Sequence, residues 1–172
     1  MIFRSLILFL FFTQLSQLNG QPDSRFRPFD WVLYRGAGSI SSITEGFAFA
    51  YIGTEMGGLK RFNLYSNNFE EPITTAQGLK DNQVTATHFD LGTGLIWVAS
   101  AHHVQYSFSR EGDWYAKELQ NLGLSRNDRI NRIGSSTNYI WLQARSSYVK
   151  LDHSSGILVG IYPTPDELDI HW

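Results

Sequence analysis

Residues 78–86 read Gly78-Leu79-Lys80-Asp81-Asn82-Gln83-Val84-Thr85-Ala86, and the apolar run Gly94-Leu95-Ile96-Trp97-Val98-Ala99-Ser100 follows them. A related copy begins 45 residues later, with Gly123-Leu124-Ser125-Arg126-Asn127 and then Asn138-Tyr139-Ile140-Trp141-Leu142. A looser copy precedes both and contains Ala50-Tyr51-Ile52-Gly53-Thr54. A period of about 45 residues, built from short strand-like runs, is typical of propeller blades. The chain is therefore predicted to be all-β, with about three four-stranded blades of an incomplete β-propeller.

Each repeat resolves into short apolar or alternating runs that are separated by turn residues. In the middle repeat, the expected strands are residues 84–89, 95–100, 103–108 and 114–119. In the third repeat they are residues 129–134, 139–144, 147–152 and 157–162, and in the first they are 39–44, 47–54 and 59–64, with a strand at 31–35 starting the cycle. The approximate blade ranges are 28–68, 69–113 and 114–162 within a partial propeller that spans residues 21–172.

A bulky aromatic residue occupies the same strand position in every repeat. Tyr51 and Trp97 lie 46 residues apart, and Trp97 and Trp141 lie 44 apart. A large flat side chain at this position can fill the wedge between neighbouring sheets, which stabilises the fold by roughly 2–3 kcal/mol for each ring that is buried. These three aromatics are therefore expected in the core rather than in a ligand site.

The N-terminal 20 residues read as a secretory signal peptide. Arg4 supplies a positive charge, and residues 6–12 form an unbroken apolar run that is too short to span a membrane. Cleavage is expected near Gly20, and a buried N-terminal strand or short helix is the alternative. The predicted location is therefore exported, either periplasmic or extracellular. The chain has no cysteine, which excludes a lipid-anchored lipoprotein and any disulfide.

Composition excludes some partners. The formal net charge is −2 and the charges are well mixed, so no basic surface for nucleic acid is expected. No Gly-x-Ser-x-Gly elbow, phosphate-binding loop or zinc-protease motif is present. The protein is therefore predicted not to be an enzyme and to have no catalytic residue and no cofactor.

Histidines and aspartates are assigned structural roles. His102 and His103 are adjacent on a strand and would point to opposite faces, so no metal site is predicted there or with His88 and His153. Asp90, Asp113 and Asp152 each lie beside a turn with Gly or Ser, where a carboxylate can accept backbone N–H bonds.

The repeat resembles a known family, the two-component regulator propeller repeat. In that family the blade reads Gly-Leu, a polar loop with Asn, Val-Thr-x-Ile, then Asp, Gly, an aromatic residue and Gly-Thr. The run 78–86 with Asp90, Gly94 and Trp97 matches this pattern best, and Tyr51-Ile52-Gly53-Thr54 matches its second half. The third repeat departs from it, with Gln143-Ala144 in place of Gly-Thr. The resemblance covers about residues 28–160 and implies a seven-bladed propeller in the exported sensor portion of a bacterial histidine kinase.

Three blades leave a propeller ring open, because closed rings have typically 4–8 blades. The chain is therefore expected to be the N-terminal part of a longer protein, with residues 163–172 leading into a further blade. Association of two copies is the alternative. The expected partners are the remaining blades of the same longer chain or a second copy, with contact to a membrane only through segments further downstream.

The best candidates for ligand binding are the polar loops that precede the first strand of the second and third blades. Loops on one face of a propeller commonly converge on the central mouth. The candidate residues are Lys80, Asp81, Asn82, Arg126, Asn127 and Asp128. The alternative is that Gly-Leu-x-x-Asn forms only the connection between blades and satisfies backbone groups.

These observations support two functional hypotheses. The first is a ligand-binding or sensory propeller module of an exported bacterial protein, for instance the periplasmic sensor part of a two-component regulator that binds a small molecule or glycan. The second is a secretion-linked or cell-surface scaffold that mediates protein–protein interaction. A propeller lyase is a weaker third option.

Overall fold

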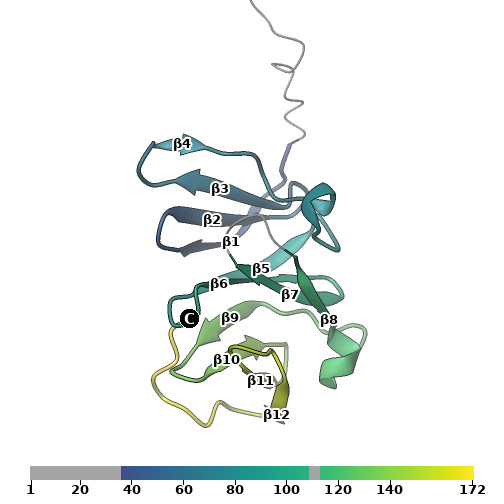
Figure 1. The fold of residues 1–172 in the computed structure, drawn as a ribbon. Helices are drawn as coiled ribbons and strands as arrows, with labels where there is room; N and C mark the ends of the chain where they lie inside the picture. Colours follow the sequence, from purple (N-terminus) through teal and green to yellow (C-terminus); the bar gives the residue numbers. More distant parts are fainter. Residues whose placement is uncertain (1–35, 109–112) are drawn as a thin grey trace, which may run out of the picture. The chain divides into compact units, whose positions relative to one another are not determined.

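The computed structural model describes residues 36–108 and 113–172, which belong to one compact unit, Arg35–Trp172. This unit contains three four-stranded antiparallel sheets (Figure 1), so the predicted all-β fold with incomplete propeller blades is confirmed. The predicted signal peptide (1–20) and the strand at 31–35 lie outside the described residues.

The first sheet has the order β1-β2-β3-β4. Its strands are β1 (Ile40–Glu45), β2 (Phe49–Thr54), β3 (Leu59–Asn63) and β4 (Asn68–Phe69). The two residues of β4 pair with the end of β3. The sequence does not predict this strand, because two residues carry no readable alternation of apolar and polar side chains.

The second sheet follows the same plan, with β5 (Val84–Asp90), β6 (Leu95–Ser100), β7 (His103–Phe108) and β8 (Tyr115–Glu118). The fourth strand was expected at 114–119, and β8 pairs antiparallel with β7. The second sheet therefore extends beyond the approximate boundary at residue 113, and the third sheet begins later than residue 114.

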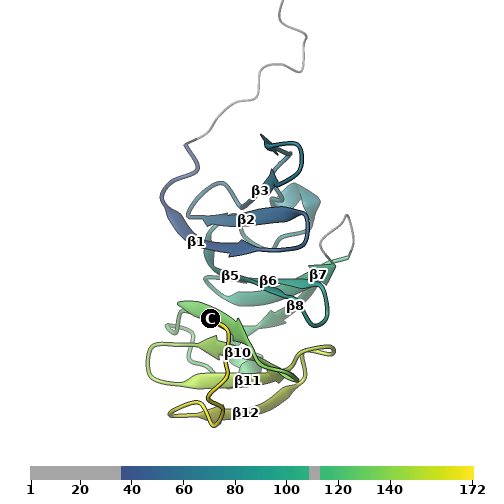
Figure 2. The same cartoon turned by 90° about the vertical axis from the view of Figure 1, so that its left-hand side faces the viewer.

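The third sheet consists of β9 (Arg132–Ser135), β10 (Tyr139–Gln143), β11 (Tyr148–Asp152) and β12 (Leu158–Tyr162). In each sheet the strands pair strictly in chain order (Figure 2), which is the connectivity of a propeller blade.

Neighbouring sheets meet through their first strands. Thr87 Oγ1 in β5 lies 3.0 Å from Ser42 Oγ in β1, and the backbone N–H of Phe89 donates to Thr44 Oγ1 at 3.0 Å. On the other side of β5, Thr85 Oγ1 donates to the backbone oxygen of Ile130 at 2.8 Å. The first strand of each sheet therefore lies at the side where the sheets converge, and the fourth strand lies at the far edge.

The predicted aromatic core is confirmed. Tyr51 is 1% exposed, and Trp97 and Trp141 are 0% exposed. The β6 side chains alternate between two apolar clusters, because successive residues of a strand point to opposite faces. Ile96 packs in the cluster that contains Tyr51, and Trp97 packs in the cluster shared with the third sheet.

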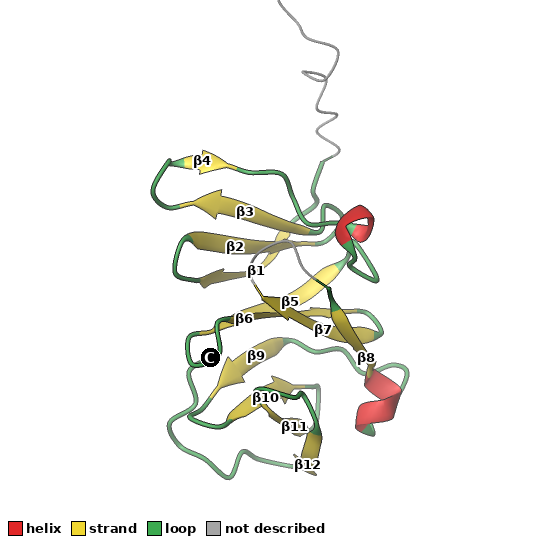
Figure 3. Cartoon of the chain, viewed as in Figure 1, coloured by secondary structure: helices red, strands yellow, loops and turns green. Residues whose placement is uncertain are grey.

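The Gly-Leu pair of the repeat terminates a short 3₁₀ turn before the first strand of a blade. Turn η1 (Thr75–Gln77) ends at Gly78 with φ of 106°, and η2 (Leu119–Leu122) ends at Gly123 with φ of 77° (Figure 3). Glycine adopts this left-handed conformation without steric cost. The leucine that follows each glycine is buried. No helix in the described part of the chain is long and apolar enough to cross a membrane.

Residues 163–172 fold back onto the third sheet. His171 forms a β-bridge with Ser135 in β9, with backbone hydrogen bonds of 2.8 and 3.0 Å. Lys150 Nζ lies 2.9 Å from carboxylate oxygens of both Asp166 and Glu167, and Trp141 Nε1 donates to Glu167 Oε2 at 3.0 Å. This segment therefore packs over the face of the sheet that carries Trp141.

Candidate functional site

Of the six predicted site residues, Asn82 has the clearest structural contacts. Its Oδ1 accepts the backbone N–H of Thr75 at 2.9 Å, and its backbone oxygen accepts the N–H of Gly58 at 2.9 Å. Asn82 thereby joins the loop before β5 to the turn between β2 and β3. These contacts fit the structural alternative for the repeated asparagine.

The two aspartates stabilise their own loops. Asp81 Oδ1 accepts the N–H of Gln83 at 2.9 Å, and Asp128 Oδ2 accepts the N–H of Ser125 at 2.8 Å. Such bonds from a side chain to the nearby backbone are typical of turn residues. The Asn127 N–H contacts Ser125 Oγ at 3.4 Å, and its side chain is exposed.

Lys80 and Arg126 have exposed side chains that line hollows in the surface. The backbone N–H of Lys80 donates to Gln105 Oε1 at 2.7 Å, while Gln105 Nε2 donates to the oxygen of Gly78 at 3.2 Å. Gln105 is 2% exposed and so holds the loop from the interior of the sheet. The loop backbone is therefore fixed and the Lys80 side chain is left facing solvent.

Two adjoining cavities lie beside β8, the fourth strand of the second sheet. The first, of about 550 Å³, is lined by Lys80, Lys117, Leu122 and Leu158 among others. The second, of about 430 Å³, is lined by His102, Gln120, Ser125 and Arg126 among others. His103 and Glu118 line both cavities. Cavities of this volume suit a small-molecule ligand.

The location of these cavities differs from the expected central mouth. Both are lined by residues of β8 and η2, at the sheet edge that is remote from β5. Lys80 and Arg126 therefore border neighbouring cavities at the outer edge. Lys117, Glu118 and His103 were not among the predicted residues. No sequence signal marks Lys117 and Glu118, because only the folded sheet brings β8 beside the two loops, and the adjacent pair His102 and His103 was assigned a structural role.

The cavity linings carry more positive than negative charge. Lys80, Lys117 and Arg126 are cationic, and Glu118 is the single carboxylate among the lining residues that the structure describes. Within residues 36–108 and 113–172, none of these four side chains forms an ion pair. Part of the lining of the larger cavity is apolar, since it includes the buried Leu122 and the exposed Ile157 and Leu158.

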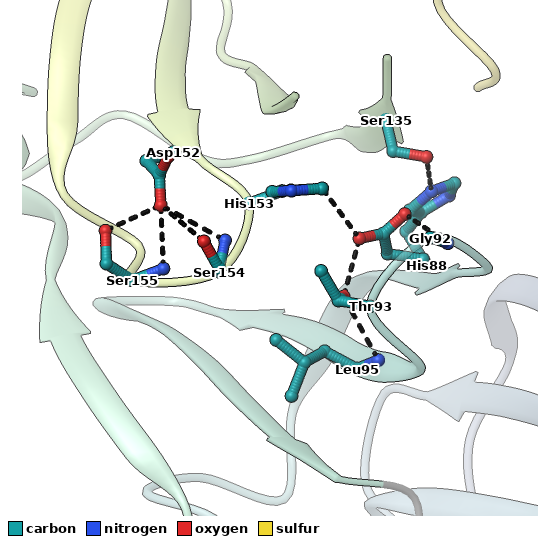
Figure 4. Close-up of polar contacts among 10 residues, drawn as sticks. His88, Gly92, Thr93, Leu95, Ser135, Asp152, His153, Ser154 and Ser155 are labelled. Carbon is teal, nitrogen blue, oxygen red and sulfur yellow. Dashed lines mark hydrogen bonds and ion pairs between the residues drawn. The ribbon is translucent and has the colours of Figure 1, made fainter. Parts of the chain in front are cut away.

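A separate buried polar cluster lies where the second sheet meets the third (Figure 4). His88 in β5 is 8% exposed, and its Nε2 lies 2.8 Å from Ser135 Oγ in β9. Burial lowers the pKa of His88 to about 4; His171 acts in the same direction, and the Asp90 carboxylate opposes it. His88 is therefore neutral near pH 7 and serves as a hydrogen-bonding link between the sheets.

Asp90 is the centre of the next group of contacts. Its carboxylate accepts the Gly92 N–H at 3.1 Å and the Thr93 hydroxyl at 2.6 Å, and His153 Nδ1 lies 3.4 Å from it. Asp90 therefore stabilises the turn after β5, as predicted, and also contacts the turn after β11. His88 and Ser135 are each 8% exposed and Asp90 is 2% exposed, so the geometry of this cluster supports packing between the sheets rather than chemistry.

Asp152 organises the turn between β11 and β12. Its Oδ1 accepts hydrogen bonds from the hydroxyl and the N–H of Ser155 at 2.7 and 2.8 Å, and from both groups of Ser154. The Ser155 hydroxyl is the largest influence that lowers the pKa of Asp152, to about 2. The turn role predicted for Asp152 is confirmed, as it is for Asp90, while Asp113 is exposed.

No protein-family model and no curated protein matches the chain. Solved structures do match: two are of the extracellular domain of BT4673 from B. thetaiotaomicron, described in one as a hybrid two-component system and in the other as a one-component system. The TM-scores are 0.57 and 0.59, with sequence identities of 15% and 16%.

Each match covers 70% of this chain and 16% of the compared chain. At this level of sequence identity, the likeness to these structures shows the fold alone. Three sheets paired in chain order and joined through their first strands are therefore the blades of a β-propeller. The resemblance to the two-component regulator propeller is confirmed at the level of architecture, and both structures that share it are of the extracellular domain of BT4673.

Proposed function

We propose that this chain is part of an exported β-propeller that senses a ligand, as the periplasmic or extracellular sensor of a bacterial two-component regulator. The observation that carries the proposal is the likeness of its three blades to the extracellular domain of a signalling system. A propeller fold alone hosts many functions, so the proposal depends on the kind of neighbour as well as on the fold.

Export is supported by the first 20 residues. Arg4 followed by the apolar run at 6–12 has the composition of a secretory signal. The remaining blades of the ring come from a longer chain or from a second copy of this one. The Lys80 and Arg126 loops supply the ligand site.

The export step is tested by producing residues 1–172 in a Gram-negative host and separating the periplasm from the cytosol. The protein is expected in the periplasm with its N-terminus cut near Gly20, as read by mass spectrometry. Leu8→Arg breaks the apolar run and should hold the protein in the cytosol, while Gln17→Arg, outside the run, should not. A parent chain that stays uncut in the cytosol would contradict export.

The sensing step is tested by thermal unfolding of the exported chain with oligosaccharides from pectin, xylan, mannan and host mucin. A ligand that binds only the folded chain stabilises it by about 3 kcal/mol at a ligand concentration of 100 times Kd. The unfolding temperature rises as a result. We expect at least one saccharide class to do so. Failure of every class to stabilise the chain would contradict ligand sensing.

A secretion-linked or cell-surface scaffold is the second candidate, and one observation favours it. The edge strand β12 exposes apolar side chains, with Leu158 at 39%, Val159 at 48% and Ile161 at 43%. Apolar side chains on an open edge strand suit docking to another protein. A chain that is exported, is stabilised by no saccharide and sediments as a complex with a co-exported protein would favour this function.

A further inference from the structure

We propose that the two adjoining cavities beside β8 form one binding cleft for a small carboxylate-bearing molecule. This inference rests on the proposed sensing function, because it names the chemical class of the ligand and the place where it binds. The cavities share His103 and Glu118, and their volumes of about 550 and 430 Å³ suit a molecule of two or more rings.

The charge of the cleft is opposite to that of the chain. Lys80, Lys117 and Arg126 border it against Glu118, whereas the whole chain has a formal net charge of −2. An excess of one sign of charge around a cleft raises the local concentration of oppositely charged ligands. Since none of these cations has a carboxylate partner among the described residues, each can donate charge-assisted hydrogen bonds to a ligand.

The loops present two of these cations from rigid positions. Gln105, which is buried, bonds both the N–H of Lys80 and the oxygen of Gly78. Asp128 fixes the loop that carries Arg126 through the N–H of Ser125. A backbone that is already ordered loses little entropy when the side chain binds, which favours affinity.

The apolar part of the lining of the larger cavity favours a ligand that also has an apolar face. Leu122 is 3% exposed, and Ile157 and Leu158 beside it are open to solvent. A molecule with one apolar face would cover these side chains while its carboxylate reaches Lys117 or Arg126. Two kinds of acid have this chemistry, namely a uronate oligosaccharide and an organic acid with an apolar body.

Isothermal titration calorimetry of the full chain tests the proposal with two matched pairs of probes. Digalacturonate is compared with neutral galactobiose, and 4-phenylbutyrate is compared with 4-phenyl-1-butanol. We expect one acid to bind at least about tenfold more tightly than its neutral partner, since each charge-assisted bond adds roughly a factor of ten. The acid that binds identifies the source of the ligand.

Substitutions locate the site. Lys117→Gln and Arg126→Gln should each weaken binding of the acid by about tenfold, and Lys117→Arg should retain binding. Arg145→Gln, an exposed arginine outside both cavities, is the control for net charge and should leave affinity unchanged. All three positions have surface-accessible side chains, and equal unfolding temperatures of the variants will verify that folding is intact.

The inference is wrong if neither acid binds more tightly than its neutral partner, or if both glutamine variants bind like the parent. A neutral saccharide that stabilises every variant equally would overturn the carboxylate cleft and leave the sensing function in place. A chain that is not exported would overturn the sensing function whatever the calorimetry finds.

Discussion

Thr85 in β5 donates a 2.8 Å hydrogen bond from its hydroxyl to the backbone oxygen of Ile130, 45 residues further along the chain. On the other side of the same strand, Thr87 contacts Ser42, which is 45 residues earlier. The interval at which the sequence repeats is therefore also the interval at which neighbouring sheets bond to each other. Each of these bonds therefore joins two residues that occupy nearly the same position in neighbouring repeats.

Thr85→Val should destabilise the chain by about 1–2 kcal/mol, because it removes the donor and leaves a buried carbonyl oxygen unpaired. Thr85 is 5% exposed and valine has nearly the same shape, so packing changes little. Unfolding in urea measures the effect. Thr164→Val, at an exposed residue, is the control and should shift stability by less than about 0.5 kcal/mol. Equal effects of the two substitutions would mean that the Thr85 bond does not join the sheets.

Gly58 and Gly94 have the same φ of 72° but different surroundings. A Cβ on Gly58 would meet the backbone oxygen of Ile73, whereas a Cβ on Gly94 would meet only the ring of Phe47 at 3.8 Å. Gly94→Ala should cost about 1–2 kcal/mol from the left-handed backbone alone. Gly58→Ala should cost about 3 kcal/mol or more, since the backbone must also shift. Denaturant titration of the two variants checks this order, and a larger loss for Gly94→Ala would contradict it.

Glu167→Gln should destabilise the packing of residues 163–172 on the third sheet. Lys150 Nζ lies 2.9 Å from Glu167, and the lysine side chain is 8% exposed, so loss of this charge leaves a nearly buried ammonium group with only Asp166. The expected loss is about 1–3 kcal/mol. Hydrogen exchange at the His171 amide should quicken in parallel, because that amide bonds to Ser135.

The control for Glu167 is another glutamate in an ion pair. Glu70 lies 3.7 Å from Arg61, and its side chain is 37% exposed. Glu70→Gln should therefore change stability by less than about 1 kcal/mol, as is usual for surface pairs. If the two glutamine variants were equally stable, the C-terminal segment would not be held by Lys150.

Acid should weaken the fold through His88. In the unfolded chain a histidine takes up its proton near pH 6.5, whereas burial lowers the pKa of His88 to about 4. The folded chain therefore binds fewer protons in this interval, so stability is full above pH 6.5 and falls as the pH drops to about 4. The loss attributable to His88 is up to about 3 kcal/mol. Carboxylates with lowered pKa values, Asp152 and Glu167, add their effect only at lower pH.

Urea unfolding of His88→Asn between pH 7 and 4.5 measures this contribution. The variant should be less stable at pH 7 but should lose most of the pH dependence in that interval. His102→Asn, at an exposed histidine, should keep the dependence of the parent. A parent chain whose stability is flat from pH 7 to 4.5 would show that His88 is not buried in its neutral form.

The blade architecture could be predicted because each blade repeats the same local signals. Gly78 and Gly123 mark the left-handed ends of the 3₁₀ turns, and Trp97 and Trp141 mark the buried centre of the second strand. These features depend on residues that are close in sequence, so they can be predicted from the sequence before the tertiary structure is known. The strand β4 could not be predicted, since two residues at an open edge need no apolar pattern.

Only some of the residues that line the candidate cleft could be predicted from the sequence. Lys80 and Arg126 lie in loops whose polarity stands out, whereas Lys117 and Glu118 lie in an edge strand, where charged side chains are ordinary. Their proximity to the loops arises from the pairing of β8 with β7, at the edge away from β5. The role of residues 163–172 was also hidden, because the contacts of Asp166 and Glu167 with Lys150 depend on how the chain turns after β12.

Oxidation of a cysteine pair tests the stacking of the blades most directly, because the natural chain contains no cysteine. The hydroxyl oxygens of Ser42 and Thr87 lie 3.0 Å apart, in β1 and β5 of neighbouring sheets. Ser42→Cys with Thr87→Cys should form an intramolecular disulfide under mild oxidation, detected as a linked peptide by mass spectrometry. Ser42→Cys with Thr85→Cys, whose side chain bonds to Ile130 instead, should form it far more slowly. If the pair at 42 and 87 crosslinks no faster than the pair at 42 and 85, the blades do not meet through their first strands and the propeller assignment is wrong.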